Sequence, residues 1–142
     1  MRSLKQLLDG KPPLVSVGPG DSVFDALSLM AQHGIGALLV LDGGKLVGIF
    51  SERDYARKVV LKGKASKDTP VREIMSDRIS CVTLKQSVEE CMALMTDRHV
   101  RHLPVLGEGN EVLGVVSIGD MVKETISEQK FIIEQLERYI TM

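Results

Sequence analysis

The sequence contains no tryptophan, and three phenylalanines and two tyrosines are its only aromatic side chains. Surfaces that bind single-stranded nucleic acid stack the bases on aromatic rings, so such a surface is not expected here. The formal net charge is −1, which also excludes a positive field over the whole protein. Both absences argue against a nucleic-acid partner, and any site for an anion must depend on local charges.

Cysteine and long apolar runs are also scarce. The two cysteines, Cys81 and Cys91, form no CxxC pair, so we expect two reduced thiols in the core rather than a disulfide or a metal pair. The sequence contains no run of 18 or more apolar residues, so it predicts no membrane-spanning helix. Residues 1–13 have too short an apolar core for a signal peptide. These features predict a cytoplasmic protein with no membrane partner.

The common catalytic patterns are missing as well. The sequence has no nucleophile beside a base, no pair of carboxylates at a useful spacing, no P-loop and no GxGxxG. We therefore expect no enzymatic activity and no catalytic cofactor.

What the sequence does contain is an internal duplication. Residues 16–30 align with 81–95 at an offset of 65, and residues 48–54 align with 114–120 at an offset of 66. The one-residue slip falls in a turn that contains glycine in both copies, where an insertion costs least. A fixed period in the sequence indicates two copies of one structural unit.

Each copy predicts a β-α-β-β-α unit. A short strand precedes a helix whose apolar residues recur at i, i+3, i+4 and i+7, and a hairpin with a glycine-containing turn leads into a second helix. About 60 residues bury little surface alone, so we expect an α/β fold in which the two β-α-β-β-α units pack sheet to sheet as a pseudo-twofold pair. The predicted domains are residues 5–64, residues 69–126 and a C-terminal amphipathic helix at 127–142.

The end of each hairpin carries the motif Gly-x-x-Ser-x-x-Asp, in residues 48–54 and 114–120. A serine followed three residues later by an acid is typical of a helix N-cap, and Ser22 and Ser87 open the first helices in this way. The alternative is a binding site. Hydroxyls and amides at a helix N-terminus bind anions, glycine allows close approach to the backbone, and a carboxylate can bind ribose hydroxyls. Because the motif occurs twice, each time after a buried strand, we interpret it as half of a nucleotide site.

The duplicated motifs resemble the cystathionine-β-synthase (CBS) domain. The resemblance rests on SVGPGDSV and CVTLKQSV, on RHLPV at 101–105, and on GIFSERD and GVVSIGD, and it covers about residues 5–126. It implies a tandem pair, called a Bateman module, that binds adenosine-containing ligands in clefts between its two units and regulates a partner protein. AMP is the ligand expected first, with ADP, ATP, NAD or S-adenosylmethionine as alternatives.

The resemblance also assigns positions to the ligand. Ribose would bind Asp54 and Asp120, and phosphate would face the hydroxyls of Ser51 and Ser117. The adenine end would lie at the strand openings, where Cys81 departs from the threonine that many members carry. The positions assigned to the adenine end are Ser16, Val17, Cys81 and Val82.

Positive charge is concentrated between the first helix and the hairpin of the second copy, and one further cation lies beside Asp54. These side chains could neutralise phosphate, and a solvated basic loop is the alternative. Alternation along a strand places Arg101 and His102 on opposite faces, so the whole cluster cannot contact one ligand. His99 and His102 lack a third ligand at metal-site spacing, so no metal is expected. The residues assigned to phosphate are Arg53, Arg98, Arg101 and His102, besides the two serines.

Residues 126–140 predict a further helix with a wide apolar stripe. Such a stripe on a terminal helix requires a partner surface, and CBS pairs commonly dimerise. We therefore expect a homodimer through the CBS helices and the C-terminal helix, together with an unknown effector protein. A structural dimerisation module with degenerate sites is the alternative function. The stripe consists of Ile126, Ile133, Leu136 and Ile140, widened by Phe131 and Ile132.

Overall fold

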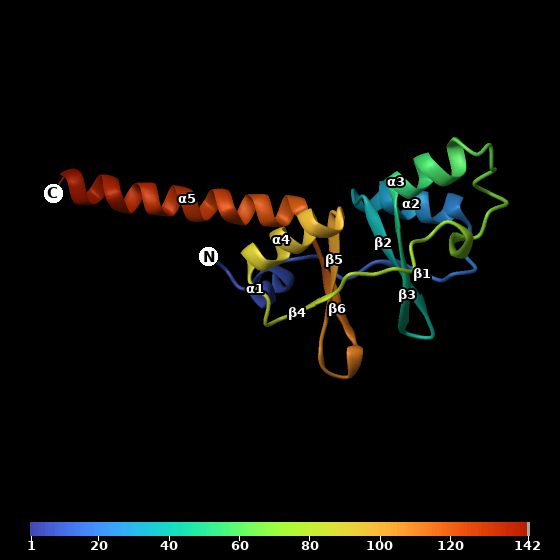
Figure 1. Cartoon of the computed structure of the whole chain (residues 1–142), viewed down its shortest axis with the longest axis horizontal. Coiled ribbons are helices and arrows are strands. Elements are labelled where there is room, and N and C mark those ends of the chain that lie inside the picture. Colours follow the sequence, from blue (N-terminus) through green and yellow to red (C-terminus); the bar gives the residue numbers. More distant parts are fainter. Residues whose placement is uncertain (142) are drawn as a thin grey trace. The chain divides into compact units, whose positions relative to one another are not determined.

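The computed structural model describes residues 1–141, which form two compact units. The N-terminal unit consists of residues 13–79, and the C-terminal unit consists of residues 1–12 together with 80–142. Each unit contains one three-stranded sheet with its helices (Figure 1). The α/β class and the β-α-β-β-α order predicted for each copy are therefore confirmed.

The N-terminal unit has the strand order β1-β2-β3, with β1 parallel to β2 and β3 antiparallel to it. Its core lies between the sheet and α2, where Val23, Ala26 and Met30 repeat at helical spacing and are buried. Phe50 is the largest fully buried side chain of this core. The elements are β1 (Ser16–Val17), α2 (Val23–His33), β2 (Ala37–Asp42), β3 (Lys45–Ser51), α3 (Glu52–Tyr55), the π-helix η1 (Ala56–Val60) and the 3-10 helix η2 (Val71–Glu73).

The C-terminal unit repeats this topology with the order β4-β5-β6. The helix face of Val88, Cys91 and Met95 is buried, as the periodicity predicts, and both cysteines are free thiols. The elements are α1 (Leu4–Asp9), β4 (Val82–Thr83), α4 (Val88–Arg98), β5 (His102–Leu106), the 3-10 helix η3 (Glu108–Asn110), β6 (Val112–Ser117) and α5 (Ile118–Thr141).

The first helices of the two copies end in the same backbone conformation with different residues. Gly34 caps α2 with φ 63°, and His99 caps α4 with φ 55°. The left-handed region carries a steric cost for residues with a Cβ atom, so glycine is the usual residue there. His99 therefore serves as a helix C-cap, and its place in the basic cluster has a structural cause.

Helix α1 belongs to the C-terminal unit although it precedes the N-terminal unit in sequence. Leu4 and Leu7 are buried in the same core as Val105 and Val116. The predicted range 5–64 groups α1 with the first copy because it follows the order of the chain. The observed units are defined by core contacts, which group α1 with the second copy. The amphipathic pattern of α1 shows that it buries a face but does not show against which sheet.

The predicted boundary between the two copies, after residue 64, is not where the N-terminal unit ends, because the following residues also pack in that unit. Thr69 accepts a hydrogen bond at its carbonyl oxygen from the Val23 backbone N–H at 2.9 Å, and its side chain is buried. Val71 and Ile74 then enter the core beside Phe50. Residues 65–79 therefore belong to the N-terminal unit, and Val71 and Ile74 contribute to its core.

The helix that begins after Ser117 and the predicted C-terminal helix are one continuous helix, α5. No glycine or proline interrupts the sequence after Gly119, so nothing local ends the helix between them. Its C-terminal half extends beyond the other elements of the C-terminal unit (Figure 1). Within residues 1–141, no helix combines the length and the apolar character needed to cross a membrane.

Candidate functional site

In the N-terminal unit, the candidate site begins where β3 ends and α3 starts. Ser51 caps the helix, with its Oγ accepting from the Asp54 backbone N–H at 3.2 Å. The Ser51 backbone N–H and hydroxyl both donate to Asp54 Oδ2, at 3.0 and 3.1 Å. Lys58, one turn further on, lies 3.4 Å from Asp54 Oδ1. The carboxylate is thus fixed on one oxygen by serine and faces a lysine with the other.

The C-terminal unit builds the same arrangement at the junction of β6 and α5. Ser117 Oγ accepts from the Asp120 backbone N–H at 3.1 Å, and the Ser117 backbone N–H donates to Asp120 Oδ2 at 2.8 Å. The lysine here comes from the distant N-terminal segment. Lys11 Nζ donates to Asp120 Oδ2 at 2.5 Å and to the Val115 carbonyl oxygen at 2.7 Å.

Asp120 is mostly shielded from solvent, with 24% of its side chain exposed. Burial alone would raise its pKa because it disfavours the charged form. The hydrogen bonds from Lys11 and from the Ser117 backbone N–H outweigh burial and hold the pKa of Asp120 below its usual value. The carboxylate therefore stays ionised at neutral pH.

We expect the stabilisation that Lys11 contributes to disappear in acid. A lowered pKa in the folded state means that the Asp120 carboxylate stabilises the fold above its unfolded pKa of about 4, and that this contribution is lost as the pH falls through the folded pKa. The variant Lys11→Met removes the cation, so the gap in free energy of unfolding between wild type and variant should be largest near neutral pH. Urea unfolding at about pH 7, 5 and 3 measures this gap. A gap that does not change with pH would contradict the assignment.

Capping itself does not distinguish the candidate site from the other helix starts. Ser87 and Glu90 form the same reciprocal cap on α4, and Ser22 Oγ accepts from the Asp25 backbone N–H on α2. Among the four caps of residues 22–120, a lysine ammonium group lies within 4 Å of the cap carboxylate only at Asp54 and Asp120. Lysine is therefore the feature that separates the two second-helix caps from the ordinary ones.

Sequence reasoning missed both lysines. Lys58 had a local signal, because a side chain four residues after Asp54 lies on the same face of a helix. Lys11 had none, because it is 109 residues from Asp120 and reaches it only through the packing of α1 on β6.

The glycines of the duplicated motif do not leave room beside the backbone, contrary to the expectation that they admit a ligand. A Cβ atom on Gly48 would lie 2.9 Å from Met75 Cγ, and one on Gly114 would lie 2.7 Å from Leu8 Cδ2. The close approach is made by a side chain of the same unit in both cases. These glycines are required by the core rather than by a ligand.

The backbone amides at these helix starts are also largely occupied. The N–H groups of Ser51 and Asp54 bond within the cap, and the Glu52 N–H donates to the Gly36 carbonyl oxygen at 3.1 Å. The Ile118 N–H donates to the Arg101 carbonyl oxygen at 2.9 Å in the same way. The expected cluster of free amides for phosphate is therefore wrong, and phosphate recognition would depend on cationic side chains.

The predicted basic residues differ in exposure and in their places on the elements of their own units. His102 is opposite Ser117 in the β5–β6 pairing, so these two side chains share a face of the sheet. Arg101 is exposed just before β5, and Arg98 is exposed at the end of α4, 3.7 Å from Asp97. Arg53 is exposed on α3. Two of the predicted phosphate ligands on the C-terminal unit, His102 and Ser117, are thus brought side by side by the strand register.

The predicted adenine-end residues lie at the far strand of each sheet. Ser16 pairs with Leu39 of β2, which pairs with Ile49 of β3, so Ser16 and the motif strand are about 10 Å apart across the sheet. Cys81 immediately precedes β4, and its partial burial raises the pKa of its thiol. Val17 and Val82 are buried in the two cores, so their side chains serve packing.

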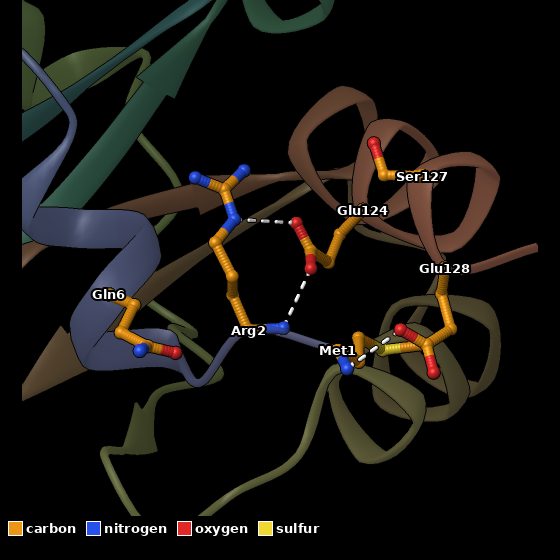
Figure 2. Close-up of a pocket in the computed structure, with 6 residues that line it drawn as sticks. All are labelled: Met1, Arg2, Gln6, Glu124, Ser127 and Glu128. Carbon is orange, nitrogen blue, oxygen red and sulfur yellow. Dashed lines mark hydrogen bonds and ion pairs between the residues drawn. The ribbon is translucent and has the colours of Figure 1, made fainter. Parts of the chain in front are cut away.

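An open pocket of about 500 Å³ lies elsewhere on the C-terminal unit and contains none of the predicted site residues (Figure 2). Arg2 binds the buried Glu124 through its backbone N–H at 2.7 Å and its Nε at 2.9 Å. The Arg2 backbone N–H is the main reason that the pKa of Glu124 is lowered despite its burial. This pair holds the N-terminal segment on α5. Within the described part of the chain, no group of three His, Cys, Asp or Glu could hold a metal ion.

Comparison with known proteins shows the family. The model for the CBS domain matches residues 5–61 and 71–127, and the chain belongs to the CBS-domain family. The mitochondrial CBS domain-containing protein CBSX3 of Arabidopsis thaliana is 41% identical over 125 residues, which are 84% of this chain and 60% of that protein. A solved structure of a protein with CBS domains from Burkholderia ambifaria MC40-6 is 50% identical, with a TM-score of 0.85 over 90% of this chain and 96% of that one.

A more distant solved structure has the same fold. The CBS domain pair of protein MJ0100, in complex with 5′-methylthioadenosine and S-adenosyl-L-methionine, is 23% identical with a TM-score of 0.80, over 90% of this chain and 98% of that one. The predicted resemblance to a tandem CBS pair is therefore confirmed.

Proposed function

We propose that this protein is a regulatory module whose two units each bind an adenosine-containing ligand, with ribose on Asp54 and on Asp120. The observation that carries the proposal is the repeated cap in which a partly buried carboxylate has a lysine against it. A carboxylate accepts hydrogen bonds from both hydroxyls of a ribose, and an adjacent ammonium group can turn to meet a phosphate. Two ordinary caps in the same chain lack this combination.

AMP is the first ligand we propose, with ADP, ATP, NAD or S-adenosylmethionine as alternatives. Each half-site brings one lysine to the carboxylate, which matches a ligand with a single phosphate better than one with three. The complex of the MJ0100 pair with two adenosine compounds supports the adenosine class, because a related fold holds such compounds in that protein. Ser16 and the backbone before β4 are the proposed adenine end.

The two half-sites are not equal. Lys11 comes from the N-terminal segment and Lys58 from the same short helical segment as Asp54, so ligand binding at Asp120 would compete with a contact that fixes the N-terminal segment. Ligand binding there would consequently change how that segment is held. If the ligand changes the affinity of a partner protein for this segment by some factor, the partner must change the affinity of the ligand by the same factor. The proposed effector is a second protein, and the module itself is proposed to act as a homodimer without catalysis.

Thermal unfolding with AMP, ADP, ATP, NAD, S-adenosylmethionine and a short RNA tests the proposal. A ligand at 100 times its Kd should stabilise the protein by about 2.7 kcal/mol. Asp54→Ala and Asp120→Ala should each reduce the shift produced by the ligand, whereas Asp25→Ala, which removes the matching acid of an ordinary cap, should leave it unchanged. No shift with any adenosine compound, or an equal shift in both site variants and wild type, would refute the proposed sites.

A further inference from the structure

Residues 57–67 of the N-terminal unit form a strongly basic stretch in a chain that is otherwise acidic. They contain five of the 18 lysines and arginines and none of the 19 aspartates and glutamates. We call residues 57–67 the basic segment. Figure 1 shows it in green at the edge of the N-terminal unit, where η1 continues into the turn that leads toward η2. Its cations are Arg57, Lys58, Lys62, Lys64 and Lys67.

Two large apolar side chains project from the middle of the basic segment. Val59 is buried in the core, but Val60 and Leu61, which follow it, are 54% and 78% exposed. Backbone hydrogen bonds hold the turn that presents them. The Gly63 N–H donates to the Val60 carbonyl oxygen at 3.2 Å, and the next N–H, of Lys64, donates to the Val59 carbonyl oxygen at 2.9 Å. The exposure of these two side chains is therefore built into the folded turn.

An exposed aromatic ring lies against the other end of the basic segment. Phe24 is 44% exposed, and its backbone N–H donates to the Ser66 carbonyl oxygen at 3.0 Å. The Lys67 ammonium group lies 5.1 Å from the centroid of the Phe24 ring. A lysine can cover an apolar ring with its methylene groups while its charge stays in contact with water. Apolar side chains and cations therefore occur together at both ends of the segment.

Part of the positive charge has no anion beside it. Lys58 and Lys64 each have a carboxylate within 4 Å. Arg57 and Lys62 are exposed, and no ion pair within the described part of the chain involves either of them. These two cations can therefore meet an external anion without breaking an ion pair of the folded chain.

We propose that the basic segment binds the surface of an anionic lipid bilayer, with Val60 and Leu61 in the headgroup layer and the surrounding cations on the headgroups. Polybasic segments are attracted to anionic bilayers, and adjacent apolar side chains strengthen the binding through burial. The sequence predicts no membrane partner because it contains no spanning segment, but surface binding requires none. The inference is independent of the adenosine ligand proposed above.

The composition of the segment favours lipid over an acidic protein or a nucleic acid. Four of its five cations are lysines, and protein interfaces are depleted in lysine and enriched in arginine. Leu61 projects from a turn, so a protein partner would need a matching pocket, whereas a lipid layer deforms around a side chain. A nucleic acid would place Val60 and Leu61 against charged phosphates. A lipid surface offers an apolar layer directly beneath its negative charges.

Cosedimentation of the full chain with lipid vesicles tests the role of charge. At about 0.1 M salt, vesicles of phosphatidylcholine with about 30% phosphatidylserine should bind the chain at least tenfold better than vesicles of phosphatidylcholine alone. The double variant Arg57→Gln, Lys62→Gln should weaken this binding about 25-fold, because each cation near an anionic surface contributes about fivefold.

A second double variant is the matched control for charge. Lys5→Gln, Lys130→Gln also removes two exposed cations, but both lie outside the basic segment, so this variant should bind like wild type. Absence of binding to the anionic vesicles, equal binding to both kinds of vesicle, or an equal loss in the two double variants would overturn the proposal.

Leu61→Ser tests the apolar contact separately. It should weaken vesicle binding about tenfold, because burial of a leucine side chain contributes at least that much. Thermal stability should not change, since the side chain is exposed in the folded chain. Tyr139→Ser removes a side chain of similar exposure outside the basic segment and should bind like wild type.

Two outcomes with Leu61→Ser would assign the surface to another partner. If this variant binds vesicles like wild type while the charge variant does not, the basic segment is a general surface for anions and the lipid assignment is wrong. If Leu61→Ser instead lowers the molar mass of the protein in sedimentation equilibrium, Leu61 contacts a second copy of the chain and the proposal is overturned.

Discussion

Leu4→Ala is expected to lower the free energy of unfolding of the C-terminal unit by about 2–5 kcal/mol. Leu4 is 1% exposed and lies in the core of that unit, although it stands at the start of the chain. Truncation to alanine removes buried methyl groups and leaves a cavity under β6 that α1 cannot fill. Urea unfolding measures the total loss.

Hydrogen exchange resolved by residue locates the effect. Amides of β5 and β6 should lose protection, while those of β2 and β3 should keep theirs, because Leu4 belongs to only one of the two cores. Leu14→Ala provides the control, since the same truncation at a side chain that is 40% exposed should cost little. Equal loss of protection in both sheets would show that α1 does not belong to the C-terminal unit alone.

Gly48→Ala is expected to destabilise the N-terminal unit by about 1–3 kcal/mol without a direct effect on ligand affinity. The added methyl group would overlap the Met75 side chain, including its Cγ at 2.9 Å and its Cβ at 3.2 Å. Because Cβ is fixed by the backbone, rotation of Met75 cannot relieve the whole overlap. Chemical denaturation measures the loss.

The other copy of the motif supplies a matched comparison. Gly114→Ala would meet Leu8 Cδ2 at 2.7 Å and the other Leu8 atoms only at 3.7 Å or beyond, so a rotation of Leu8 can accommodate it and the loss should be smaller. The double variant Gly48→Ala, Met75→Ala should also lose less than the sum of its two single changes. If the loss in free energy of unfolding in the double variant equals the sum of the two single losses, Met75 is not the residue that requires glycine at position 48.

The parts of the structure that the sequence predicts correctly are those determined by nearby residues. The spacing of Val23, Ala26 and Met30 determines the buried face of α2, and the serines determine where helices begin. The duplication also predicts that Ser117 and Asp120 repeat the geometry of the first copy, because a repeated local sequence forms a repeated local structure.

Features that depend on long-range packing could not be predicted. Nothing near Asp120 indicates that Lys11 reaches it, since that contact follows from the docking of α1 on β6. The close approach at the motif glycines is real, but the sequence does not show that Met75 and Leu8 make it. The roles of the site residues toward a ligand remain predictions that the binding experiment tests.

The placement of α1 has a consequence for how the chain folds during synthesis. Residues 13–79 form a continuous segment and can fold as soon as they leave the ribosome. Residues 1–12 emerge before this segment, but their core partners in β5 and β6 are synthesised about 100 residues later. During that interval Leu4 and Leu7 have no core to enter, so the nascent chain exposes this apolar helix longest of all its elements. A chaperone that binds this exposed apolar segment would therefore act on α1 until β6 is complete.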